Sequence, residues 1–462
     1  GSVFAVAGLF AEVRIIPVDE AVKMAIESNL SLESARISLD TKKRKNDLKW
    51  NQFIPTVSAN GSLVRDNDAG TVSGFMPVDK VPLNPFLSGL PSDVPNIYGV
   101  VPYSVNAPQW HIAGGISASI TIVTALFEGL KNYQLDYEAG VLSYGKAKAQ
   151  MERDLRKLYN NILLAEENLR LQKEKYTVAE RTEAQALANY RAGLAPELQY
   201  LQAQVAKENL KPQIDDAENN VRLVKANLAF VIGLPYDAEI ELVPLSDEFN
   251  PVSLEVAQLI ADASRNKPDI LELRQTLLVV QSGRKAQALQ AWTPYLNLGW
   301  NMQRTFKDDP WEDSWGDADS WQKSGSLTIT LGMTFNGLVP WFKEGQAVKD
   351  MDNQIAGLNV NLAQMVRGTE IEVYNTCLTL EKTKASVEAM RQNVDLAARS
   401  YRSTETAYRS GLQTLLEVQN AANQQQEARL GVMSQMITYI NGLIDLEYAL
   451  GVPFGSLSKQ GE

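Results

Sequence analysis

The chain has 462 residues, of which 45% are hydrophobic and 21% charged, so it is not a disordered polypeptide. Its net charge of −11 argues against nucleic-acid binding, because no basic excess is present to neutralise phosphates. A single cysteine excludes a disulfide framework, and no apolar run reaches the roughly 18–20 residues that a membrane-spanning helix needs.

Residues 1–17 are interpreted as the remnant of a secretory signal or as an N-terminal segment, because a short apolar stretch opens the chain. The spacing of apolar residues then predicts a helix over Val18–Phe53, which Pro55 ends. From Thr56 to Arg65 apolar and polar residues alternate, which predicts a strand with one apolar face.

The next segment, 66–110, contains seven prolines and is predicted to have no regular structure. Alternation returns over His111–Val123 and predicts a second strand. A proline-free stretch, Leu126–Tyr190, then carries apolar residues at heptad spacing, which is typical of a coiled coil. Its return arm is predicted over Pro196–Ile232, so the two segments form a long helical hairpin.

The second half of the chain repeats this order. It has a helical pattern to Trp292, alternating residues from Leu296 and again to Phe335, and a long proline-free helix to Tyr408. The turn at Tyr190 recurs at Tyr408, 218 residues later. The repetition divides the chain into a first repeat at 18–233, a connector at 234–251, a second repeat at 252–453 and a tail at 454–462. The hairpin turns lie at 190–196 and 408–414.

The four predicted strands are about ten residues long, which is the length that a tilted strand needs to cross a bilayer. An open sheet edge in lipid leaves backbone groups unpaired, and four strands are too few to close a barrel alone. The chain must therefore form oligomers if the strands span a membrane. A dimer would supply eight strands and a trimer twelve, and the periodicity does not distinguish them. A soluble four-stranded sheet remains the alternative.

This arrangement resembles the TolC-like outer-membrane efflux factors from Val18 to Phe454. The resemblance is carried by the two Tyr-Arg-X-Gly-Leu turns, the strand-ending Phe-X-Gly sequences at Phe127 and Phe335, the prolines that begin strands, and the Gly-X-Pro sequences at Gly233 and Gly451. It implies a trimer with a twelve-stranded transmembrane β-barrel and a long α-helical coiled-coil barrel in the periplasm. It also implies a passive exit duct of a tripartite efflux or type I secretion system, with a periplasmic adaptor protein and an inner-membrane pump as partners.

In such a duct the hairpin turns are periplasmic tips, where the adaptor docks and the channel closes. The resemblance assigns eight residues to the tips: Tyr190, Arg191, Gly193, Leu194, Tyr408, Arg409, Gly411 and Leu412. Family members often carry a basic residue just after the second tip and acids one and two turns further on. Gln413, Glu417 and Asn420 occupy these places here, which favours a hydrogen-bonded gate over an ion-paired one. Glu417 faces either the lumen or the solvated outer surface.

Four aromatic residues on the strands or at their ends are predicted to lie at membrane interfaces: Trp110, Tyr295, Trp300 and Phe335. The lone histidine, His111, has no nucleophile or acid in a recognisable motif, and no phosphate-binding glycine loop is present. The sequence therefore predicts no catalytic residue, cofactor or metal site. A soluble coiled-coil scaffold or adhesin is the alternative function.

Overall fold

The computed structural model describes residues 14–67, 70–78, 99–106, 109–245, 249–306, 316–333, 335, 341–410 and 412–459. The chain forms two compact units. The first is mainly helical and comprises Gly1–Asp47, Lys131–Gly283 and Asp350–Glu462. The second contains the long strands and comprises Leu48–Leu130 and Arg284–Lys349. Of residues 1–17, the structure describes the last four, and those before Arg14 lie outside the described residues.

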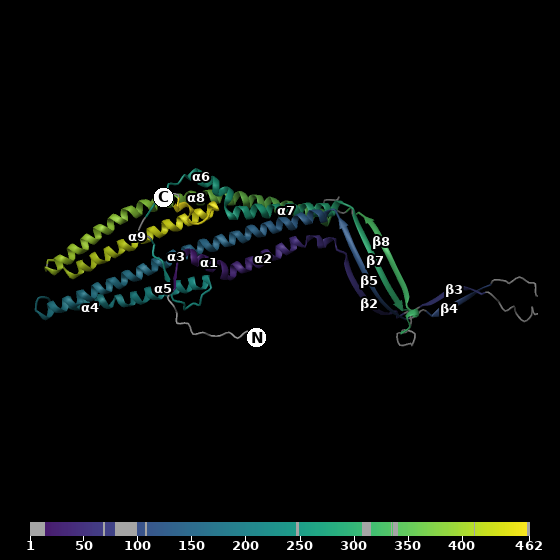
Figure 1. Ribbon diagram of the computed structural model, residues 1–462, viewed down its shortest axis with the longest axis horizontal. Helices are drawn as coiled ribbons and strands as arrows, with labels where there is room; N and C mark the ends of the chain where they lie inside the picture. Colours follow the sequence, from purple (N-terminus) through teal and green to yellow (C-terminus); the bar gives the residue numbers. More distant parts are fainter. Residues whose placement is uncertain are drawn as a thin grey trace, which may run out of the picture. The chain divides into compact units, whose positions relative to one another are not determined.

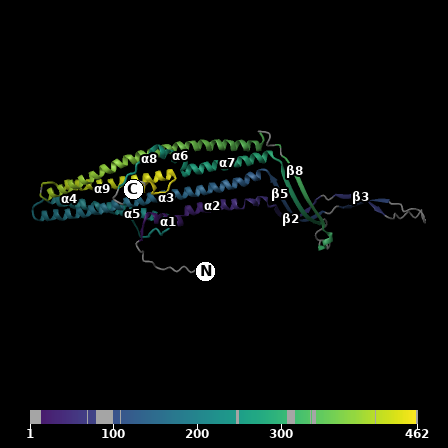
Figure 2. The same ribbon diagram turned by 45° about the horizontal axis from the view of Figure 1, so that its top comes forward.

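Helical hairpins make up the first unit, and α3 lies beside α4 and α5 while α8 lies beside α9 (Figures 1 and 2). The helices are α1 (Val18–Ser28), α2 (Leu30–Asp47), α3 (Ala125–Arg191), α4 (Glu197–Glu208), α5 (Leu210–Ile232), α6 (Val256–Asn266), α7 (Pro268–Trp292), α8 (Lys343–Arg409), α9 (Leu415–Leu450) and α10 (Ser456–Lys459). Two short strands, β1 (Arg14–Ile16) and β6 (Ile240–Leu242), pair in parallel.

The apolar seam predicted for the long helices forms the core of this unit. Leu155 and Ile162 of α3 are buried with Leu228 and Ile232 of α5. A second cluster joins α6, α8 and α9, and it includes the buried Cys377. The second cluster uses residues three or four apart on one helix face, such as Val373, Cys377 and Leu380 of α8. The helix predicted over Val18–Phe53 is instead divided into α1, α2 and the 3₁₀ turn η1 (Lys49–Phe53).

The second unit contains a four-stranded antiparallel sheet in the order β2-β5-β7-β8. Its strands are β2 (Thr56–Arg65), β5 (Trp110–Val123), β7 (Tyr295–Phe306) and β8 (Gln322–Gly332). A 3₁₀ turn, η4 (Ala318–Ser320), precedes β8. These are the four strands that the two-residue periodicity predicts, and β2 has the predicted bounds. The mixed fold of long helices and four long strands is thereby confirmed.

The prediction of no regular structure over 66–110 was wrong. Within it, β3 (Thr71–Val78) and β4 (Gly99–Asn106) form an antiparallel ribbon. Pro77 pairs with Val100, and Pro102 pairs with Phe75. Both strands of a two-stranded ribbon are edge strands, so a proline can sit where its missing N–H would point away from the partner.

The register of the four-stranded sheet aligns apolar residues in rows across it. One such row is Val57, Ala118, Trp300 and Leu327. The next residues along the strands form a polar row, Ser58, Ser117, Asn301 and Ser326. Because side chains alternate between faces, the sheet has one apolar face and one face of hydroxyl and amide groups.

Candidate functional site

The turn between α3 and α4, which holds the first predicted tip residues, ends α3 through Gly193. Gly193 has φ 72°, its N–H donates to the Tyr190 carbonyl at 2.9 Å, and the Leu194 N–H donates to the Asn189 carbonyl at 2.9 Å. This pair of bonds satisfies the last carbonyls of a helix and requires a left-handed residue, which favours glycine. Arg191 is exposed, and Leu194 is 79% exposed.

The turn between α8 and α9 holds the second set of predicted tip residues. The Leu412 N–H donates to the Ala407 carbonyl at 2.9 Å, which matches the Leu194 bond of the first turn. Arg409 pairs with Glu405 at 2.7 Å on the exposed surface of α8. Gly411 lies outside the described residues.

Glu417 and Thr414 form a capping box at the start of α9. The Glu417 N–H donates to Thr414 Oγ1 at 3.3 Å, and the Thr414 N–H donates to Glu417 Oε2 at 2.7 Å. The hydrogen bonds from Thr414 lower the pKa of the exposed Glu417 carboxyl below its ordinary value. With its amide nitrogen turned toward Glu417, Gln413 also donates to Oε1 at 2.8 Å. The structure thus brings Gln413 and Glu417 together, while Asn420 lies exposed one turn further along α9.

A small apolar cluster holds the two hairpins together behind these turns. Ala186 of α3, Ala203 of α4 and Leu415 of α9 are buried, and Tyr408 of α8 packs against them. Burial raises the pKa of the Tyr408 hydroxyl above its ordinary value. On the first hairpin, the rings of Tyr190 and Tyr200 stack with centroids 6.4 Å apart.

Next to this cluster, α4 and α9 border a groove with both apolar and amide side chains, which the sequence interpretation missed. Leu198, Leu201 and Val205 line it from α4, and Leu416 lines it from α9. All four side chains are at least 45% exposed. Their spacing on α4 follows one helical face, so the pattern was present in the sequence. A groove of this kind suits an apolar partner surface.

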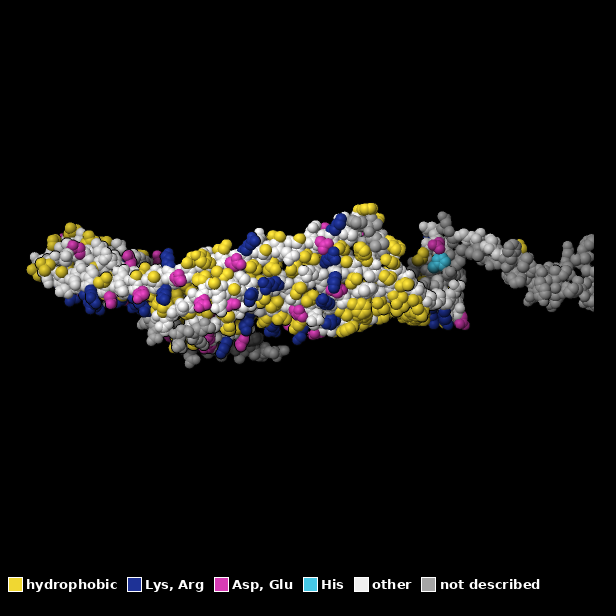
Figure 3. Space-filling view, turned by 90° about the horizontal axis from the view of Figure 1, so that it is seen from above, with side chains coloured by type: hydrophobic (Ala, Val, Ile, Leu, Met, Phe, Trp, Pro, Cys, Tyr) yellow, Lys and Arg dark blue, Asp and Glu magenta, His cyan; other side chains and the backbone are white. Residues whose placement is uncertain are grey.

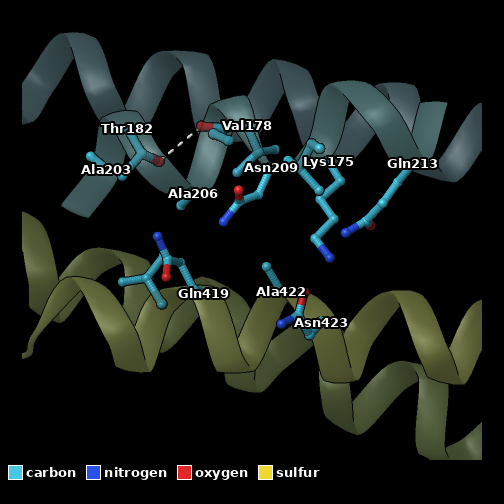
Figure 4. A pocket seen from close by; sticks show the side chains of 13 residues that line it. Lys175, Val178, Thr182, Ala203, Ala206, Asn209, Gln213, Gln419, Ala422 and Asn423 are labelled. Carbon is cyan, nitrogen blue, oxygen red and sulfur yellow. Dashed lines mark hydrogen bonds between the residues drawn. The ribbon is translucent and has the colours of Figure 1, made fainter. Parts of the chain in front are cut away.

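Further along the hairpins, a polar cavity of about 200 Å³ separates α3, α4 and α5 from α9 (Figure 4). The Lys175 ammonium points into it, opposite Asn423 and near the amide of Gln213. Burial lowers the pKa of Lys175, and the charge of Glu427 acts in the opposite direction. The buried Asn423 Oδ1 has no hydrogen-bond partner. The contact between the hairpins is therefore apolar at the cluster around Leu415, whereas this cavity holds a partly buried ammonium and an unpaired amide oxygen.

The four aromatic residues predicted to lie at membrane interfaces occupy different positions along the strands. Trp110 begins β5, where Arg65 lies over its ring at 5.7 Å. Tyr295 begins β7 at the opposite end and pairs with Gly332. Trp300 lies in the middle of β7, in the apolar row described above, and is 44% exposed. Phe335 follows β8 and is 65% exposed.

The sequence interpretation missed a second group of aromatic residues where helices meet strands. Phe53 contacts both Trp50 and Phe127, with ring centroids 5.8 Å apart in each pair. Trp50 and Phe127 are more than half exposed. Their positions beside Pro55 and after Val123, at the strand ends, were a usable signal.

His111 lies at the distal end of β5, beside Asp66, and the Nε2–Oδ2 distance is 2.8 Å (Figure 3). In the described part of the chain, no cluster of His, Cys, Asp or Glu has the size of a metal site. Nor does any described helix have the length and hydropathy to cross a bilayer.

Comparison with protein families gives a match over residues 21–234 to the model of the family described as outer membrane efflux protein. Curated proteins include no sequence that matches the chain.

Several solved structures share the fold. The chain resembles the CmeC outer membrane channel of Campylobacter jejuni with 16% identity and a TM-score of 0.69, covering 96% of this chain and 88% of that one. It resembles the open state of the MtrE outer membrane channel of Neisseria gonorrhoeae with 18% identity and a TM-score of 0.68, covering 94% and 89%. The outer membrane protein VceC of Vibrio cholerae matches with 14% identity and a TM-score of 0.68, covering 95% and 96%. Because the sequence identities are low, these similarities establish the fold alone.

Proposed function

Because the chain belongs to the outer membrane efflux protein family, we propose that three copies form a passive exit duct that the helical tips open and close. The family is one of transport proteins of the outer membrane, with helices in the periplasm. The family match does not support the alternative of a soluble scaffold or adhesin. The observation that carries the proposal is the four-stranded sheet with its aligned apolar and polar rows.

The two outer strands of this sheet supply the argument for an oligomer, and the resemblance to the TolC-like efflux factors makes that oligomer a trimer. β2 and β8 each pair on one side only, with β5 and β7 respectively. In lipid such edges cost several kilocalories per mole for each unpaired group, so they must pair with another copy. Three copies supply twelve strands, which is within the range of known barrels, and the apolar face then meets lipid while the polar face lines the pore.

The internal repetition predicted from the sequence is part of the same proposal. α3 and α8 both have 67 residues, and α5 and α9 both end at a left-handed glycine, Gly233 and Gly451. Two similar hairpins per chain give six in a trimer, and long helical hairpins side by side can continue a barrel as a tunnel.

The groove between α4 and α9 is the surface that we assign to the periplasmic adaptor protein, which in turn connects the duct to an inner-membrane pump. Its exposed Leu198, Leu201 and Leu416 fit a helical partner that lays an apolar face into it. The groove is lined by residues that follow the two turns in sequence, so docking there would act on the helices that leave the turns.

The gate that we propose is hydrogen-bonded and lies at the second tip. Gln413, Thr414 and Glu417 form a local network, and Tyr408 packs into the apolar cluster between the hairpins. The cavity at Lys175 weakens the contact between hairpins, because the desolvation of this partly buried ammonium outweighs the attraction of Glu427. Opening would therefore separate α9 from α3 and α4 along this cavity.

Two measurements test the proposal. Carbonate extraction should leave the protein in the outer-membrane fraction, and its release into the soluble fraction would rule out the membrane-spanning sheet. In planar bilayers, the double variant Tyr408→Ala/Arg409→Ala should conduct more than the wild type. The matched control is Tyr374→Ala/Arg367→Ala, two exposed residues of α8 outside the turn. Equal conductance in the tip variant and the wild type would show that these two residues do not hold the gate.

A further inference from the structure

The far end of the sheet carries basic side chains on the apolar face. The register places Arg304 beside Lys323 on neighbouring strands, in a row that continues through Gly114 and Gly61. Arg65 lies on the same face, four residues beyond Gly61 along β2. All three cations are exposed. Alternation therefore gives the apolar face a basic cluster, Arg65, Arg304 and Lys323.

This basic cluster has no anionic partner within the part of the chain that the structure describes. Among the described residues at this end of the sheet, His111 pairs with Asp66; the register puts His111 on the opposite, polar face, and alternation after Arg65 puts Asp66 on the same face. The acid and the three bases are thus separated onto two faces. Exposed cations on a face that meets lipid are stabilised by an anionic group at the membrane surface, because an unpaired charge in an apolar environment is strongly unfavourable.

The position of the basic cluster along the strands indicates which surface of the membrane it meets. The chain leaves the helices at Thr56 and Tyr295 and returns to them after Val123 and Gly332, so the end at Arg65 is the end remote from the helices. With the helices in the periplasm, this end lies at the outer surface of the membrane. The Trp110 ring, over which Arg65 lies at 5.7 Å, is an amphipathic group suited to that interface.

The surface in the row of Arg304 and Lys323 is also open. A Cβ atom at Gly114 would meet nothing within 4 Å, and one at Gly61 would meet only the Ala113 carbonyl at 4.0 Å. The row Gly61, Gly114, Arg304 and Lys323 therefore combines two bare backbone positions with two neighbouring cations. A phosphate group can approach the backbone there and accept hydrogen bonds from both side chains.

We propose that Arg304 and Lys323, with Arg65 beyond them, bind the phosphate-bearing headgroup of an anionic lipid of the outer leaflet. The inference rests on the proposed placement of the apolar face in the membrane. Binding fixes the height of the barrel in the bilayer, because the cations meet phosphate while the rows below them meet hydrocarbon.

The test is a lipid titration of the purified trimer in neutral detergent, read as the rise in its thermal-unfolding midpoint. Phosphatidic acid is the anionic probe, and phosphatidylcholine and inorganic phosphate are the comparisons. The variant Arg304→Gln/Lys323→Gln should bind phosphatidic acid about thirtyfold more weakly, since each basic side chain near an anionic lipid surface contributes about fivefold. Lys323→Gln alone, on the edge strand, should lose about fivefold. The control Lys384→Gln/Arg399→Gln removes the same charge from exposed positions of α8 and should bind as the wild type does.

Three other outcomes would contradict the proposal, and each does so in a different way. If phosphatidic acid and phosphatidylcholine both stabilise the wild type and the double variant equally, the sheet meets lipid but the cations do not select the headgroup. If inorganic phosphate produces the same dependence on Arg304 and Lys323, the site binds a free anion and no lipid. If neither lipid stabilises the wild type, the membrane-spanning sheet and the lipid site both fail.

Discussion

Thr414→Ala should loosen the first turn of α9 and leave the rest of the helix intact. The substitution removes the hydroxyl that accepts the Glu417 N–H at 3.3 Å but keeps the bond from the Thr414 N–H to the Glu417 carboxylate at 2.7 Å. Loss of a threonine cap costs about 1 kcal/mol, which is about a fivefold change in an opening equilibrium. Opening stays local because Leu415 and Val418 are buried, at 5% and 3% exposure.

Amide hydrogen exchange of the trimer measures this change. Peptides that cover the start of α9 should exchange about fivefold faster in Thr414→Ala, whereas peptides from the first tip should be unchanged. The matched control is Thr438→Ala on the same helix, where an exposed threonine hydroxyl donates only to the Ser434 carbonyl, at 2.8 Å. Unchanged amide protection in Thr414→Ala, or an equal increase in exchange rate at both tips, would refute the claim that the capping box stabilises the second tip locally.

Three further predictions concern the pH dependence of conductance, a charge introduced on the apolar face of the sheet, and a glycine in a left-handed backbone conformation. Because hydrogen bonds from Thr414 lower the pKa of Glu417 below its ordinary value, their stabilisation is fully present above that ordinary value and is lost as pH falls through the lowered pKa. Wild-type conductance should therefore rise in that acid range, while Glu417→Gln should show no such rise; identical pH profiles would contradict this. Ile329→Lys places a charge in an apolar row and should cost about 2–4 kcal/mol and reduce trimer in outer-membrane fractions. Thr328→Lys on the polar face should assemble normally, and equal losses would show that the faces are assigned wrongly. Gly451→Ala should lower the thermal-unfolding midpoint, because φ is 66° and the added Cβ would lie 2.6 Å from the Asn266 carbonyl oxygen. The left-handed backbone alone costs about 1–2 kcal/mol. Gly357→Ala, in open space on α8, should not lower it.

The strands could be predicted from the sequence because period-two alternation directly encodes a two-faced sheet. The alternation around Val57 and Ser58 was enough to give the bounds of β2. The same reasoning fails for 66–110, because proline excludes a strand only where its missing N–H must pair. Neither Pro77 nor Pro102 meets that condition in a two-stranded ribbon.

Helix interruptions were missed although a local signal was present. Asn29 lies between α1 and α2, and its side chain accepts the N–H of Ser31 at 3.0 Å and of Leu32 at 3.2 Å. An asparagine that caps a new helix looks, in a periodic pattern, like one more polar position. The Thr414–Glu417 box has a recognisable spacing too, but the sequence interpretation names only Glu417 of this pair, as a gate residue. The groove at Leu198 and Leu416 depends on two helices meeting, which no single periodic segment encodes.

The two tips end their first helices in the same way but begin their second helices differently. Both α3 and α8 end with a bond from a leucine N–H to the carbonyl five residues earlier. α9 then starts with a full capping box and runs unbroken for 36 residues. α4 starts after Pro196 with no side-chain cap, and it ends after 12 residues at Asn209, beside the polar cavity. Side-chain caps and an unbroken length both stabilise a helix. The first turn of α4, which begins the return arm of the first hairpin, is therefore less stable than the first turn of α9. The groove therefore lies between α9, whose first turn is capped by side chains, and α4, whose first turn has no side-chain cap. A partner that fills the groove can shift α4 at lower cost than α9, and comparison of the two tip peptides in the exchange experiment measures that difference directly.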